Sequence, residues 1–73
     1  MITNAPTAKQ VSDLMLRVSR ELEDSLDMVK KASPAEEFAA YRLAVGKIMA
    51  DILLEMLNPL YAKHPSLKPP GFK

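Results

Sequence analysis

Few residues of this 73-residue chain have the types and spacing that chemistry requires. The chain has no cysteine, so it offers no thiolate as a nucleophile or zinc ligand and no disulfide. Its one histidine, His64, stands between Lys63 and Pro65, and the nearest preceding acid is Glu55. A general base needs an orienting carboxylate and a nucleophile within reach, and this spacing supplies neither. We therefore expect an exposed histidine, no catalytic, cofactor-binding or metal site, and a protein that is not an enzyme.

Arg42 is the best candidate for a polar site, because it interrupts an apolar sector of a predicted helix. Folding the chain back on itself would place Tyr41 and Arg42 beside Ser25 and Asp24. An arginine in that position could orient an anionic ligand. It could instead lay its stem over the edge of the core and form an ion pair with Glu21 or Asp24. We favour the structural interpretation, since edge residues of this kind are common.

The element that would carry Ser25 and Asp24 is a helix predicted over about residues 6–31. Its start carries two overlapping signals: Asn4 can cap it, with Pro6 in the first turn, and Thr7 with Gln10 also has the spacing of a capping box. Apolar residues then recur every three or four positions, which is the period of one helix face. The opposite face alternates acidic and basic side chains, as a solvent-exposed face does. The apolar positions are Val11, Met15, Val18, Leu22, Leu26 and Val29.

A turn at Ser33 separates this helix from the next. The run Ser33-Pro34-Ala35-Glu36 has the spacing of a capping box, with proline at the first helical position. Proline also disfavours helical dihedrals at the preceding residue, which ends the first helix there. Two helices joined so tightly must fold back on each other. The sequence therefore predicts an all-α fold, an antiparallel two-helix hairpin that forms a single domain over residues 1–73.

The second helix, predicted over about residues 34–57, is apolar on two sides. One stripe consists of Phe38, Tyr41, Val45, Met49, Ile52 and Met56, and the other of Ala39, Leu43, Gly46, Ala50, Leu54 and Leu57. The first helix can cover only one stripe, and a soluble monomer rarely leaves so large an apolar patch open. We predict that the second stripe is a homodimer interface, and that two hairpins form a four-helix bundle. A glycine inside a helix costs about 1 kcal/mol relative to alanine, so close helix packing would explain Gly46.

Residues 58–73 form a proline-rich C-terminal tail. Pro59 cannot donate a backbone hydrogen bond, so we expect the second helix to end or kink near Asn58. One interpretation is an extended strap over the bundle, and the other is a free ligand or basic arm. We favour the strap, with at least Leu60 and Tyr61 buried. The four apolar residues that would hold the strap are Leu60, Tyr61, Leu67 and Phe72.

The overall charge gives little evidence for any one class of partner. Ten lysines and arginines face nine acids, for a net charge of +1. No signal peptide or membrane span is evident, so we expect a cytoplasmic protein. Our functional hypothesis is a small protein-protein interaction or adaptor module that acts as a homodimer. The alternative is a small nucleic-acid-associated regulator that uses the basic tail, although basic residues are not concentrated on one face.

Overall fold

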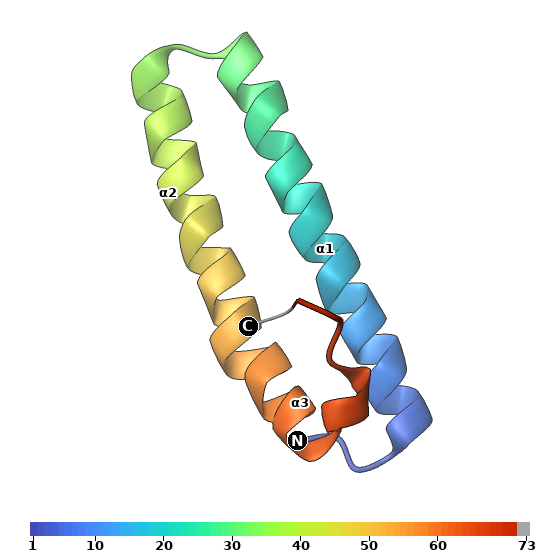
Figure 1. The fold of residues 1–73 in the computed structure, drawn as a ribbon. Coiled ribbons are helices and arrows are strands. Elements are labelled where there is room, and N and C mark those ends of the chain that lie inside the picture. The colour runs from blue at the N-terminus through green and yellow to red at the C-terminus, as the bar shows by residue number, and fades with distance from the viewer. Residues whose placement is uncertain (72–73) are drawn as a thin grey trace.

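The computed structural model describes residues 1–71, and in this part of the chain all the regular structure is helical. The two long helices, α1 and α2, lie side by side and run in opposite directions, so the all-α prediction is confirmed (Figure 1). After α2 the chain continues without a break through a π-helix, η1, into α3, and a short 3-10 turn, η2, follows. The bounds are Ala5–Ala32 for α1, Ala35–Asp51 for α2, Ile52–Leu57 for η1, Asn58–Lys63 for α3 and Pro65–Leu67 for η2.

The start of α1 is capped by Asn4, one of the two signals in the sequence. The Asn4 side chain accepts a hydrogen bond from the Thr7 backbone N–H at 2.9 Å, and Pro6 lies in the first turn. Such a cap satisfies one of the four amide groups that a helix start leaves without a partner. At the other end, Lys30 and Lys31 lie in the last turn, where positive charge favours the helix dipole.

The turn between α1 and α2 differs from the prediction, because Ser33 does not cap α2. The first helical residue is Ala35, which puts Pro34 at the capping position, and a proline side chain has no group that can accept a hydrogen bond. The backbone carbonyl of Pro34 instead accepts from the N–H groups of Glu37 and Phe38, at 3.1 and 3.0 Å. Ser33 itself has extended dihedrals and ends α1.

Near Asn58, where the sequence predicts an end or a kink of the second helix, η1 gives way to α3, and the helical path continues to Lys63. The six-residue π-helix η1 carries the chain into Pro59, and the Asn58 N–H donates to the carbonyl of Leu53, five residues earlier. Proline in an α-helix clashes with the carbonyl four residues before it. The wider π-turn changes this alignment locally, so Pro59 is accommodated without ending the helix.

The most deeply buried side chains gather where α3 approaches the first half of α1. Leu60 is fully buried and Tyr61 is 5% exposed, so their predicted burial is confirmed. They reach the core from a helix, however, and not from an extended strap. Leu67 is half-buried, and Phe72 lies outside the described residues. The buried apolar side chains of residues 1–71 are Ala8, Val45, Leu57, Leu60 and Tyr61.

Candidate interaction surface

The first apolar stripe of α2 and η1 faces α1. Val45 is 3% exposed, and the other members of the stripe are half-buried. This packing uses the apolar face of α1, whose members from Val11 to Val29 are half-buried in turn. The hairpin is therefore held by one face of each long helix, as the two periodicities predict.

The second stripe of α2 remains uncovered within the chain. Leu43 is 63% exposed and Leu54 is 59% exposed, and the small residues between them are exposed too. Exposure of single apolar residues is common, but an aligned set on one helix face is a candidate interaction surface. We call this set the open face; its members are Ala39, Leu43, Gly46, Ala50 and Leu54.

Leu57 does not belong to the open face, although the sequence places it in the same stripe. Its side chain is 3% exposed within the chain, so it has no surface left for a partner. The cause is the π-helix η1, which ends at this residue. Each π-turn holds more residues than an α-turn, so each residue advances less around the axis. By the end of η1 the chain has rotated less about the helix axis than an α-helix of the same length would. Leu57 therefore lies on the side that faces α1.

Gly46 lies in the middle of the open face, over a shallow depression of about 390 Å³. A Cβ atom added at Gly46 would meet no heavy atom within 4 Å. Packing within the chain therefore does not explain why a glycine stands in the helix at this position. The depression is lined by Ala39, Arg42, Leu43, Gly46, Lys47 and Ala50.

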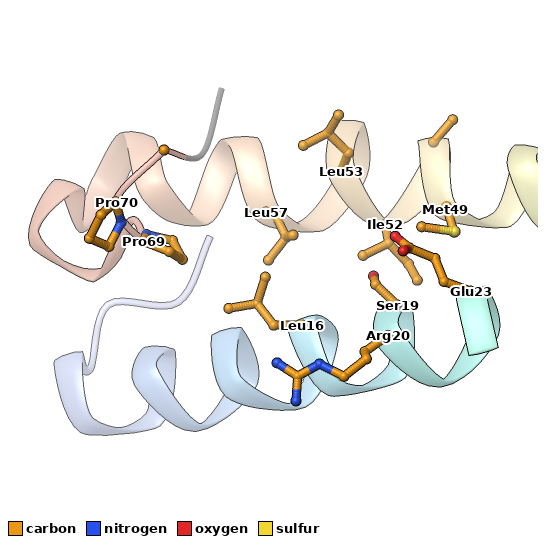
Figure 2. A pocket seen from close by; sticks show the side chains of 12 residues that line it. Leu16, Ser19, Arg20, Glu23, Met49, Ile52, Leu53, Leu57, Pro69 and Pro70 are labelled. Atoms are coloured by element: carbon orange, nitrogen blue, oxygen red, sulfur yellow. The ribbon is translucent and has the colours of Figure 1, made fainter.

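A larger groove of about 690 Å³ lies between α1 and the path of α2 and η1, and Pro69, Pro70 and Gly71 also line it. Figure 2 shows Leu16 and Leu57 approaching each other across this space, with Arg20 and Glu23 on α1. Leu16 is not among the apolar positions predicted for the buried face of α1, yet it is half-buried and lines the groove. Ala50 lines both hollows, so the groove and the open face form one continuous surface. The apolar lining includes Leu16, Met49, Ile52, Leu53 and Leu57.

Of the predicted polar site, Tyr41 and Ser25 contact each other, whereas Arg42 does not take part in this contact. Tyr41 and Ser25 lie side by side, with their hydroxyl oxygens 2.7 Å apart. Because the Ser25 hydroxyl donates to the Leu22 carbonyl at 2.6 Å, the Tyr41 hydroxyl is the donor to Ser25. This bond joins the two long helices, which is a structural role. Asp24 is exposed and forms no ion pair with any residue of 1–71.

Arg42 does not form the ion pair expected with Glu21 or Asp24. Within residues 1–71 the only ion pairs are Lys9–Asp13 at 3.0 Å and Lys31–Asp27 at 2.9 Å, both exposed. Arg42 is itself exposed and lines the depression on the open face. It therefore borders the open face and not the contact between α1 and α2.

Two further polar contacts were missed by the sequence analysis. Ser12 and Tyr61 form a buried hydrogen bond of 2.5 Å between α1 and α3. The His64 ring nitrogen Nε2 donates to the backbone carbonyl of Ile2 at 2.6 Å, so His64 is half-buried and tied to the start of the chain. The one sequence signal for the first contact is a serine next to the apolar face of helix α1.

The described residues contain neither a metal-binding cluster nor a membrane-spanning helix. No three of their His, Asp and Glu side chains come together in a way that could hold a metal ion. None of their helices combines the length and apolar character needed to cross a bilayer. Comparisons with protein-family models, with curated proteins and with solved structures each gave no significant match.

Proposed function

We propose that this chain is a small non-enzymatic protein-interaction module that works in the cytoplasm as a homodimer. Two hairpins pack through the open face of α2 to form a four-helix bundle, and the bundle binds another protein. The observation that carries the proposal is the exposure of the open face, where Leu43 is 63% and Leu54 is 59% exposed.

The small core of the chain supports a second copy as the partner of the open face. Chains of this size bury a limited part of their surface, and oligomerisation is a common way to add to it. Only five apolar side chains of residues 1–71 are buried, and one of them is an alanine. Covering one Leu43-sized side chain adds about 1.5–3 kcal/mol. An isologous dimer covers both copies of the open face at once.

An interaction role has more support than the alternative of a basic arm for nucleic acid. The first part of the basic tail is helical, and it places Leu60 and Tyr61 in the core. His64 is bonded to the carbonyl of Ile2 and is half-buried. Phosphate binding needs basic groups that are free to reach the nucleic-acid backbone.

The proposal is tested with two copies of the chain, one carrying an affinity tag and one untagged. The untagged copy should co-purify with the tagged copy, and Ala50→Glu should abolish this, because it puts a charge into the apolar interface. Ala44→Glu is the matched control, since Ala44 is exposed on the polar side of the same helix. Loss of co-purification for both variants, or for neither, would contradict the assignment of the interface.

A further inference from the structure

Resting on the proposed function, we propose where the two-fold axis of the homodimer lies. It passes over the groove, so that Arg20 and Glu23 on the rim of one copy meet Glu23 and Arg20 of the second copy. The interface then includes α1 as well as α2, and the second copy completes the charge pairing of the groove. The occupant of the groove mouth is thus a second copy of this chain.

The first argument is the charge on the rim of the groove. Among residues 1–71, the lining of the groove includes one cation, Arg20, and one anion, Glu23, and neither forms an ion pair with any of these residues. Figure 2 shows their side chains extending in different directions, Glu23 toward Met49 and Arg20 along α1. In an isologous contact, if residue i meets residue j of the partner, then j also meets i. The opposite charges of Arg20 and Glu23 are therefore complementary to the same pair in a second copy.

The second argument is that the same axis also fits the open face. Figure 2 shows Glu23 across the groove from Met49 and Arg20 across from Ile52, so the midpoint between the two charges lies near the level of Ala50. An axis at this level sets α2 antiparallel to α2 of the second copy and brings Ala50 against Ala50. Gly46 then lies opposite Leu54 of the second copy.

This second pairing matches a large exposed side chain with an empty space. Leu54 is 59% exposed, and no heavy atom of the chain lies within 4 Å of a Cβ built on Gly46. Packing a large residue into the hole left by a small one is how facing helices interlock. The axis therefore gives Gly46 the packing reason that the single chain lacks.

The test exchanges the charges on the rim. Arg20→Glu gives a rim with two anions and Glu23→Arg gives a rim with two cations, so each variant should dimerise more weakly than the unmodified chain, by about tenfold in dissociation constant. An equimolar mixture of the two variants should recover the unmodified affinity, because each copy then meets the opposite charge. Arg17→Glu and Glu21→Arg are matched controls on α1 outside the groove lining and should not respond to mixing.

A second measurement locates the axis on α2 without changing any charge. Because the chain has no cysteine, Ala50→Cys introduces a single thiol, which should form a disulfide between copies under mild oxidation. Ala44→Cys should form it much more slowly. Suppose that the unmodified chain dimerises, that mixing the two rim variants does not restore its affinity, and that Ala50→Cys and Ala44→Cys oxidise equally. The position of the axis is then wrong, but the proposed homodimer is not contradicted. If the unmodified chain is a monomer, the proposed function fails, and this inference fails with it.

Discussion

Removal of the hydroxyl in Tyr61→Phe should destabilise the chain, because it breaks the buried hydrogen bond to Ser12. Tyr61 is 5% exposed and Ser12 is 2% exposed, and their oxygens lie 2.5 Å apart. A typical hydrogen bond contributes about 1 kcal/mol net, and a buried polar group left without a partner costs about 1–3 kcal/mol. We therefore expect Tyr61→Phe to lower the free energy of unfolding by about 1.5–3 kcal/mol.

The same bond can be isolated with a double-mutant cycle. Ser12→Ala removes the other partner, and the double variant should lose about 1 kcal/mol less than the sum of the two single losses. Tyr41→Phe is the matched control, because its partner Ser25 is half-buried and keeps its bond to the Leu22 carbonyl. The control should lose only about 0.5–1 kcal/mol.

Urea unfolding followed by circular dichroism measures these differences, with all variants at one protein concentration because a dimer's stability depends on concentration. A loss of 1 kcal/mol corresponds to a fall of about 4–8 °C in melting temperature for a domain of this size. Equal losses for Tyr61→Phe and Tyr41→Phe, or losses that add in the double variant, would refute the buried contact between α1 and α3.

Three further changes test other parts of the structure. Gly46→Ala should stabilise α2 by about 1 kcal/mol in the dissociated chain, since nothing blocks the new methyl group. It should also weaken dimerisation, because the methyl group would fill the space that the second copy occupies. An unchanged dissociation constant in analytical ultracentrifugation would contradict close packing at Gly46. Leu60→Ala should cost about 2–5 kcal/mol in urea unfolding, because Leu60 is fully buried, and a loss below 1 kcal/mol would contradict the placement of α3. Arg42→Met breaks no ion pair and should change the unfolding free energy by less than about 0.5 kcal/mol, whereas a larger loss would reveal an ion pair in solution.

The packing of the two long helices against each other could be predicted, because it depends on the regular spacing of their apolar residues. Apolar spacing in each helix identified the faces that meet, and the tight turn set the pairing that brings Tyr41 beside Ser25. The same periodicity showed that α2 has an apolar side that α1 does not cover. The cap at Asn4 was predictable as well, since it needs only a local spacing of side chain and amide.

What the sequence did not predict depends on local deviations from α-helical geometry. The π-helix η1 both carries the chain past Pro59 and turns Leu57 toward α1, and nothing in the spacing of residues 52–57 marks it. Ser33 was misassigned because a shift of one residue in the helix start moves the cap from a serine to a proline. The contact of His64 with Ile2 joins the two ends of the described chain, and such distant contacts leave no local signal.

Sedimentation equilibrium of the unmodified chain tests the central claim, that a second copy covers the open face of α2. The account predicts a mass of twice the 8.1 kDa chain at micromolar concentration, falling toward the single-chain mass in Ala50→Glu and unchanged in Ala44→Glu. A helical chain that sediments at 8.1 kDa throughout the micromolar range would contradict the claim.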